Sequence, residues 1–192
     1  FFKPGTVDEL IDFFAPVCRS GSGLPFYYYN MPSITGVNLP VDRFLVEGKK
    51  KIPNLVGTKF THNNLMEMGG CIDLEQHKFE VLHGFDEILI AGLSMGAVAG
   101  VGSTYNYIPN VYHAIFESMK QNDVETARVW QMKSIRTVEV IIKYGGGVRG
   151  GKAIMKLIGI DCGSCRFPIK TFSVEEDDKL KGDLDAIKFF DF

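Results

Sequence analysis

Short apolar segments alternate with helical segments along the first two thirds of the chain, and this order restricts the fold more than any other feature. The four apolar segments, rich in strand-forming residues, are residues 24–29, 55–61, 79–82 and 97–101. Each is followed by a segment whose apolar residues have helical spacing, and one further helix precedes the first strand. Strands that alternate with helices form βαβ units with parallel strands. The sequence therefore predicts an α/β protein with a parallel sheet.

Local signals define the expected helices. Thr6-Val7-Asp8-Glu9 has the form of a capping box, and Ser20-Gly21-Ser22-Gly23 ends the helix that follows. The expected helices are residues 7–20, 40–51, 63–77, 86–95 and 107–121, and then 123–142, 152–160 and 175–190. Only helices follow residue 121. Asp123 is expected to cap the first of them, a glycine-rich break follows at 145–151, and the acidic run at 175–178 is expected to begin the last. We predict an α/β part at residues 1–121 and a helical extension at residues 122–192.

Charge and cysteine content exclude several classes of function. The net charge is −2 and the basic residues are dispersed, so no nucleic-acid partner is expected. No apolar run reaches the length of a membrane span, so no membrane partner is expected. Cys162 and Cys165 form a single CxxC without a second pair, and His62, His83 and His113 share no ligand spacing, so no metal is expected. The cysteines, which also include Cys18 and Cys71, indicate reduced thiols in a cytosolic protein.

A single lysine, Lys59, stands at the end of the second apolar segment, before a polar loop. One interpretation is a lysine whose stem packs against the sheet while its ammonium reaches water. The other is a lysine in a dry pocket, where desolvation disfavours the charged form and leaves a nucleophilic amine. The segment alone leaves both open.

Functional residues of parallel α/β sheets lie in the loops after the carboxyl ends of the strands. Those positions hold Tyr29 and Asn30, Lys59 and Thr61, then Gly84, Asp86 and Glu87, and finally Gly102, Ser103 and Thr104. Structural alternatives stay open for each. Tyr29 could pack with its hydroxyl on a backbone carbonyl, and Asp86, Glu87, Ser103 and Thr104 could cap the next helices.

Four of these segments resemble, in the same order and at similar spacing, the motifs of the N-acetylneuraminate lyase family. They are Pro25–Pro32 with Thr35-Gly36-Val37 behind it, Gly57–Thr61, Gly84–Glu87 and Gly102–Asn106. The Gly-x-Asp-Glu pattern favours these lyases over the related dihydrodipicolinate synthases. The resemblance implies a (β/α)8 TIM barrel, of which this chain holds strands five to eight, followed by a C-terminal helical extension.

The resemblance also implies an activity. It is that of a class I (Schiff-base) aldolase, a carbon–carbon lyase of carbohydrate metabolism that splits N-acetylneuraminate (sialic acid) into pyruvate and N-acetylmannosamine. Lys59 would form the Schiff base with the keto acid, and Tyr29 would transfer protons at the hydroxyl of the bond that breaks. No cofactor is implied, and the family's quaternary structure and location suggest a cytoplasmic homotetramer.

Further site residues are likewise implied by the resemblance. Hydrogen bonds to the polyhydroxyl tail of the sugar would come from Gly84, Asp86, Glu87 and Ser103. Thr61 would line the pocket near the sugar.

The front of the chain departs from the family. The chain opens Phe1-Phe2-Lys3-Pro4, without an initiator methionine, and has no counterpart of the family's Gly-Thr-Thr-Gly-Glu loop, which holds the carboxylate of pyruvate. We therefore expect a piece of a longer protein in which Phe1-Phe2 is the tail of the fourth strand. Half a barrel leaves open edges and an uncovered interior, so we expect self-association or poor solubility and no normal lyase turnover from this chain alone.

Two alternatives remain. The chain could come from another pyruvate-dependent aldolase or synthase of the same superfamily, which would use the same lysine. It could instead be a non-catalytic, truncated relative that acts in protein interaction. The presence of both Lys59 and Tyr29 favours a fragment of an active enzyme over a decayed one.

Overall fold

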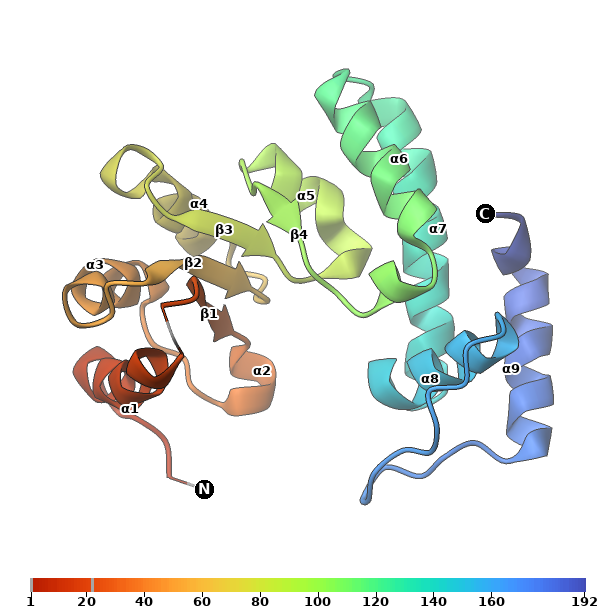
Figure 1. The fold of residues 1–192 in the computed structure, drawn as a ribbon. Coiled ribbons are helices and arrows are strands. Elements are labelled where there is room, and N and C mark those ends of the chain that lie inside the picture. Colours follow the sequence, from red (N-terminus) through yellow and green to blue (C-terminus); the bar gives the residue numbers. More distant parts are fainter. Residues whose placement is uncertain (1, 22) are drawn as a thin grey trace. The chain divides into compact units, whose positions relative to one another are not determined.

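The computed structural model describes residues 2–21 and 23–192, so that Phe1 and Ser22 lie outside the described part (Figure 1). The chain divides into two compact units. The first contains residues up to Phe85 and Ala91–Val101, and the second contains Asp86–Ile90 and Gly102–Phe192. The expected fourth-strand tail falls partly on Phe1, and the neighbouring Phe2 belongs to no strand.

A parallel sheet of four strands forms the centre of the first unit, as the alternating pattern predicts. The strands are β1 (Phe26–Asn30), β2 (Leu55–Phe60), β3 (Glu80–His83) and β4 (Ala99–Gly100), in the order β1-β2-β3-β4. Among the described residues, β1 pairs only with β2 and β4 only with β3. β4 is shorter than expected, although Val98 N and Val101 N still donate to the carbonyls of Val81 and His83.

The pairing of β1 with β2 contains one irregularity. Phe26 pairs with Leu55 and Tyr27 pairs with Gly57, so that β2 advances by two residues while β1 advances by one. From there the register is regular and places Tyr29 opposite Lys59. Neighbouring residues of a strand point to opposite faces, so the irregularity determines which side chains share a face.

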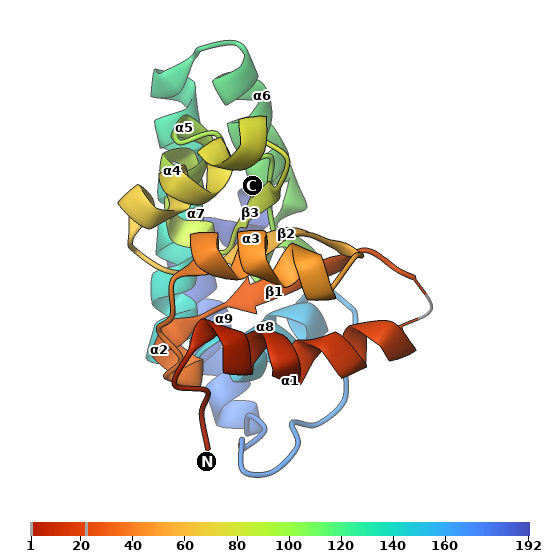
Figure 2. The ribbon, with the colours of Figure 1, turned by 90° about the vertical axis from the view of Figure 1, so that its left-hand side faces the viewer.

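Helices cover one face of this sheet. They are α1 (Val7–Ser20), α3 (Val41–Lys51) and α4 (Leu65–Asp73), and Figure 2 shows α1 beside α3. Their apolar stripes pack on Tyr28, Phe60 and Val81, all of which are buried. The opposite face carries Tyr29 and Lys59.

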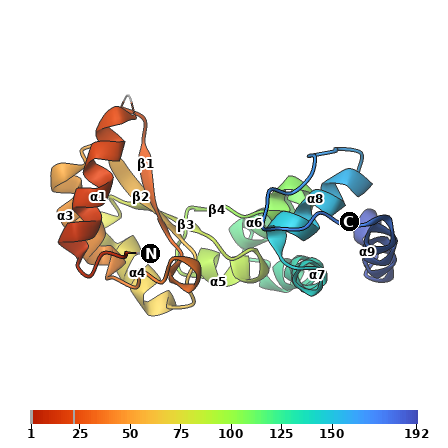
Figure 3. The same ribbon diagram turned by 90° about the horizontal axis from the view of Figure 1, so that it is seen from below.

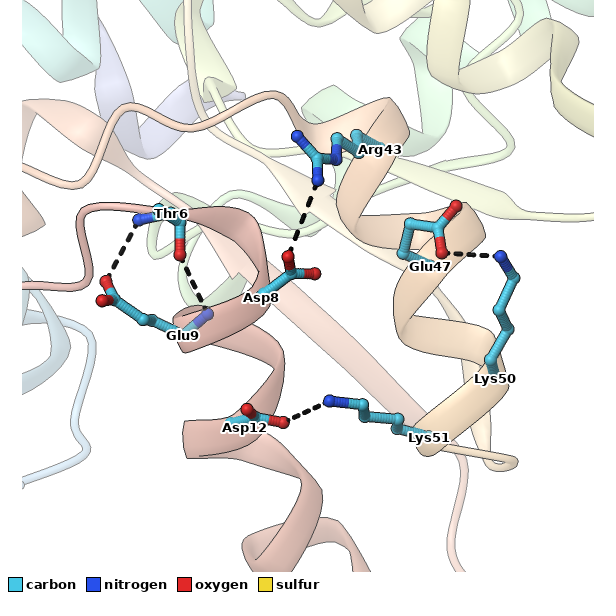
Figure 4. Close-up of polar contacts among 8 residues, drawn as sticks. All are labelled: Thr6, Asp8, Glu9, Asp12, Arg43, Glu47, Lys50 and Lys51. Carbon is cyan, nitrogen blue, oxygen red and sulfur yellow. Dashed lines mark hydrogen bonds and ion pairs between the residues drawn. The ribbon is translucent and has the colours of Figure 1, made fainter.

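α1 begins where the sequence predicts. The Thr6 hydroxyl accepts from Glu9 N at 3.2 Å, and the Glu9 carboxylate accepts from Thr6 N at 3.2 Å, which completes the capping box (Figure 4). Ion pairs on the outer surface join α1 to α3, from Asp8 to Arg43 at 3.7 Å and from Asp12 to Lys51 at 2.6 Å.

Three local differences separate the structure of residues 1–121 from the expectation. A short helix not foreseen in the sequence, α2 (Pro32–Thr35), follows β1. The helix expected at residues 63–77 ends as α4 at Asp73, and the 3₁₀ turn η1 (Leu74–Gln76) follows, because Glu75 has a φ of 46°. The helix expected at 86–95 is divided into the 3₁₀ turn η2 (Asp86–Ile88) and α5 (Leu89–Ser94).

The second unit is helical beyond the 3₁₀ turn η3 (Thr104–Asn106) (Figure 3). Its elements are α6 (Pro109–Lys120), α7 (Val124–Lys143), α8 (Gly147–Leu157), α9 (Val174–Ala186) and η4 (Phe189–Asp191). Between α6 and α7 the backbone turns at Asn122, where φ is 58°, and Asp123 then accepts from Thr126 N at 3.0 Å. The predicted Asp123 cap is therefore confirmed.

The glycine-rich stretch is only partly a break, which corrects the sequence prediction. Gly145 and Gly146 have φ near 90° and form the turn. α8 then begins at Gly147, five residues earlier than expected, and Gly150 and Gly151 are buried within it. The absence of side chains at these positions lets the helix pack closely.

The acidic run at residues 175–178 lies at the start of α9, as predicted. Ser173 and Glu176 form a capping box, and Arg149 of α8 donates to both Glu176 carboxylate oxygens at 2.7 Å. Lys156 pairs with Asp177 at 2.6 Å. None of the helices in the described part of the chain is both long enough and apolar enough to cross a membrane.

Candidate active site

Lys59 is the fifth of the six residues of β2 and points to the face of the sheet that the helices leave uncovered. Its neighbour across the strand pair is Tyr29. The Lys59 Nζ lies 4.0 Å from the centroid of the Tyr29 ring, so the two side chains share one side of the sheet. Lys59 is half-buried, and Tyr29 is 43% exposed. An amine and a phenol therefore lie within reach of one small molecule.

The Tyr29 hydroxyl does not bond to a backbone carbonyl. It donates to the Met31 sulfur at 3.4 Å, which is a weak acceptor. This weak contact does not hold the phenol oxygen firmly in place. The contact of ammonium with the ring face is a cation–π interaction, which is worth about 0.5–1 kcal/mol at an exposed site.

Thr61 and Gly84 lie together in the first unit. Thr61 is buried, and its hydroxyl has no hydrogen-bond partner among the described residues. A Cβ added at Gly84 would lie 1.8 Å from that hydroxyl oxygen, so only glycine fits at position 84. The close packing of these two loops is one physical reason for glycine there.

Asp86, Glu87 and Ser103 belong to the second unit. Asp86 is buried, at 6% exposure, whereas Glu87 is half-buried and Ser103 is exposed. The Asp86 Oδ2 accepts from Thr104 N at 3.0 Å and from the Thr104 hydroxyl at 2.5 Å. Ser103 makes no capping hydrogen bond to η3, so the helix-cap alternative is not observed for this serine.

Three helical residues complete this arrangement, and the sequence reasoning did not find them. Tyr112 of α6 bonds to the Thr104 hydroxyl, and Gln131 and Ser134 of α7 each donate to the Asp86 carbonyl at 3.0 Å. All three are buried. The sequence gives one sign of these residues: they are polar residues that interrupt the otherwise apolar stripes of α6 and α7.

Burial raises the pKa of the Tyr112 phenol above its ordinary value, and its bonds to Ser134 and Thr104 offset part of that rise. Tyr112 therefore stays protonated and can donate a hydrogen bond throughout the physiological pH range.

A groove of about 490 Å³ lies at the β1 edge in the first unit. Its walls are mostly apolar and include Phe13, Phe14, Val37 and the ring of Tyr29. Tyr29, the predicted catalytic residue, therefore lines this groove and also contacts Lys59.

No group of three or more histidine, cysteine, aspartate or glutamate side chains within the described ranges could hold a metal ion. Cys162 and Cys165 line different cavities, and Lys152 lines both of them. The Lys152 ammonium bonds to the carbonyls of residues 162, 163 and 164. His83 is buried in the first unit, and His113 is exposed.

Comparison with known families and solved structures identifies the family of this chain. The model of the dihydrodipicolinate synthetase family matches residues 1–187. The chain belongs to this family. Among solved structures of similar fold, N-acetylneuraminate lyases from Proteus mirabilis and Aliivibrio salmonicida each superpose with a TM-score of 0.92 at 35% identity. Each superposition covers 98% of this chain and 63% or 62% of the other.

Animal N-acetylneuraminate lyases are also similar to this chain. The mouse protein is 39% identical over 191 residues, which is 98% of this chain and 60% of the relative. The human protein is 38% identical over 194 residues, which is 100% of this chain and 61% of the relative. The chain thus spans about three fifths of the length of these relatives. Its α/β fold and parallel sheet match the barrel proteins of the family.

Proposed function

We propose that the protein to which this chain belongs is a class I aldolase that cleaves N-acetylneuraminate into pyruvate and N-acetylmannosamine. The observation that carries the proposal is the pairing of Lys59 with Tyr29 on one face of the sheet, 4.0 Å from amine to ring centroid. The similarity to N-acetylneuraminate lyases over nearly the whole chain supports it.

In this proposal the neutral Lys59 amine attacks the ketone carbon of the open-chain sugar acid. Loss of water gives a protonated imine, which withdraws electrons from the neighbouring carbon–carbon bond. As that bond breaks, Tyr29 relays the proton of the hydroxyl that becomes the aldehyde of N-acetylmannosamine, with the substrate carboxylate as the acceptor. The electron pair remains as an enamine on Lys59. Protonation of its carbon by Tyr29 and addition of water then release pyruvate and the free amine.

The polyhydroxyl tail of the sugar needs acceptors for its hydroxyl groups. We assign this role to Gly84, Asp86, Glu87 and Ser103, and we assign Thr61 to the lining of the pocket near the sugar. Carboxylates suit this task because they accept hydrogen bonds from vicinal hydroxyls. The half-buried Glu87 and exposed Ser103 are consistent with it.

The architecture of the intact protein is also part of the proposal. The four strands would be strands five to eight of an eight-stranded barrel, with residues 1–121 in the barrel and 122–192 as the helical extension. By similarity to the lyases, the intact protein would be a cytoplasmic homotetramer.

Borohydride trapping tests the central step. The 192-residue chain is incubated with pyruvate and sodium borohydride, and peptide mass mapping locates the reduced adduct. We expect a single adduct on Lys59, because the Tyr29 phenol beside this amine can transfer the protons that imine formation needs, and borohydride then reduces the imine to a stable amine. The adduct should disappear in Lys59→Met and persist in Lys50→Met, which removes an exposed lysine of α3. Labelling spread over several lysines, or retained in Lys59→Met, would contradict the assignment.

Substrate choice needs a second measurement. Turnover of N-acetylneuraminate is compared with turnover of other 2-keto acids by the intact protein. Preference for another keto acid would leave the Schiff-base chemistry in place and change the substrate to that of another aldolase or synthase in the family.

A further inference from the structure

Two segments of the second unit, residues 86–90 and 102–104, each contain a buried polar residue next to a more exposed one. In the first segment Asp86 is 6% exposed, and the adjacent Glu87 is half-buried. In the second segment Thr104 is 2% exposed, and the adjacent Ser103 is exposed. The outward residues, Glu87 and Ser103, are the ones best placed to meet a solute.

The inward residues bond to one another. The Thr104 backbone N–H and hydroxyl both donate to Asp86 Oδ2, at 3.0 and 2.5 Å. A Cβ added at Gly102 would lie 1.4 Å from Asp86 Oδ1, so the second segment also packs directly on this carboxyl group. The two segments are thus fixed relative to each other by their buried members.

Side chains of α6 and α7 hold Asp86 and Thr104 in place. The Tyr112 hydroxyl bonds to the Thr104 hydroxyl and lies 2.9 Å from Ser134 Oγ. Ser134 Oγ and Gln131 Nε2 each donate a hydrogen bond to the Asp86 carbonyl oxygen at 3.0 Å. Gln131 Oε1 also accepts from Ile90 N at 3.0 Å, which fixes the far end of the first segment. Such bonds in a dry interior resist rearrangement more than they would in water.

We propose that Tyr112, Gln131 and Ser134 are positioning residues that set the separation of Glu87 and Ser103 and thereby the affinity for the sugar tail. This inference rests on the proposed function, since it takes a polyhydroxyl sugar as the ligand. A site that recognises hydroxyl groups discriminates by the placement of its acceptors, and that placement depends on the groups that hold them.

The test separates the sugar tail from the keto acid. The dissociation constant of N-acetylmannosamine is measured by NMR titration of the 192-residue chain, well below the melting temperature of each variant. Trapping of pyruvate on Lys59 by borohydride is measured in parallel. We expect Tyr112→Phe and Thr104→Val to weaken sugar binding about tenfold, the effect of one lost hydrogen bond in a binding site. Pyruvate trapping should stay at the wild-type rate.

Two variants serve as controls. Thr104→Ser keeps the hydroxyl and should retain the wild-type affinity for the sugar. Ser118→Ala removes another buried serine hydroxyl of the second unit, outside this arrangement, and should do the same. Rescue by Thr104→Ser distinguishes positioning from a general loss of packing.

The outcomes are distinct. Wild-type affinity in both Tyr112→Phe and Thr104→Val would overturn the inference. A wild-type chain that traps pyruvate on Lys59 but does not bind N-acetylmannosamine would also overturn it and leave the Schiff-base proposal standing. Failure of the wild-type chain to trap pyruvate would count against the proposed function instead.

Discussion

Adjacent polar residues in this chain have different environments, and burial decides what each can do. Asp86 and Glu87 are neighbours in sequence, yet Asp86 is bound in the core by Thr104 while Glu87 is half-buried. Lys59 and Tyr29 are 30 residues apart, yet their side chains are in contact. The chemistry proposed for the site depends on these differences between single side chains.

The buried His83 gives a prediction about pH. Burial lowers its pKa below the ordinary value of 6.5. The unfolded chain binds a proton at this residue near its ordinary pKa while the folded chain does not. Its contribution to the free energy of unfolding is therefore complete above that pKa and decreases as the pH falls through the range below it.

We expect the urea midpoint of the wild-type chain to fall between about pH 7 and about pH 5.5, before most carboxylates titrate. His83→Leu should flatten this dependence, even if it lowers stability at every pH. His113→Gln, which removes an exposed histidine, should leave the slope unchanged. Equal slopes in wild type and His83→Leu would show that His83 is not the group responsible.

A second prediction at this scale concerns Gly102. Gly102→Ala places a methyl group where the Asp86 carboxyl group lies, so one of the two must move. We expect a loss of at least about 1–3 kcal/mol in the free energy of unfolding, the usual cost of overpacking. Gly182→Ala, where no atom lies within 4 Å of the added group, is the control and should not destabilise. Urea titration of both variants makes the comparison.

At the scale of elements, features that depend on nearby residues follow from the sequence. The capping box at Thr6 and Glu9 and the cap at Asp123 are local signals, and the structure confirms both. The order and direction of the strands follow from the alternation of strands with helices. α2 and the start of α8 were missed, because a four-residue helix has little periodicity and glycine is normally a weak helix former.

The candidate site also has residues that the sequence locates and residues that it does not. Lys59 and Tyr29 could be located from the ends of their strands. The support of Asp86 could not, because Ser134 reaches it from 48 residues away in sequence. A serine on an apolar helical stripe does not indicate which group it binds.

The helix caps give the third prediction. Thr6→Ala removes an acceptor for Glu9 N and should lower the free energy of unfolding of the first unit by about 1 kcal/mol. Thr6→Ser preserves the acceptor and should retain most of the stability. Urea titration followed by the amide signals of α1 makes the measurement, because a chain of two compact units need not unfold in one step. Equal loss in both variants would show that the cap is not responsible.

At the scale of the whole molecule, the sheet has free edges among the described residues, and free edges pair with other chains. We expect the 192-residue chain to self-associate, which light scattering during gel filtration measures. Val98→Lys places a charge beside β4, where Val98 is 61% exposed, and should reduce the mean mass. Val129→Lys, at a 62% exposed position of α7, should not. A monodisperse monomer in the wild type would contradict the expectation.

The extra residue in β2 beside Phe26 determines which residue of β2 lies opposite Tyr29. Had the two strands continued in step from Phe26 and Leu55, Tyr29 would stand opposite Thr58, whose hydroxyl bonds to the Tyr28 carbonyl, and Lys59 would lie one position further on. The contact between the proposed acid–base group and the proposed nucleophile therefore depends on the register of the two strands as well as on residue identities. An insertion or deletion at the start of β1 or β2 could separate the two groups while every side chain of the motif was retained.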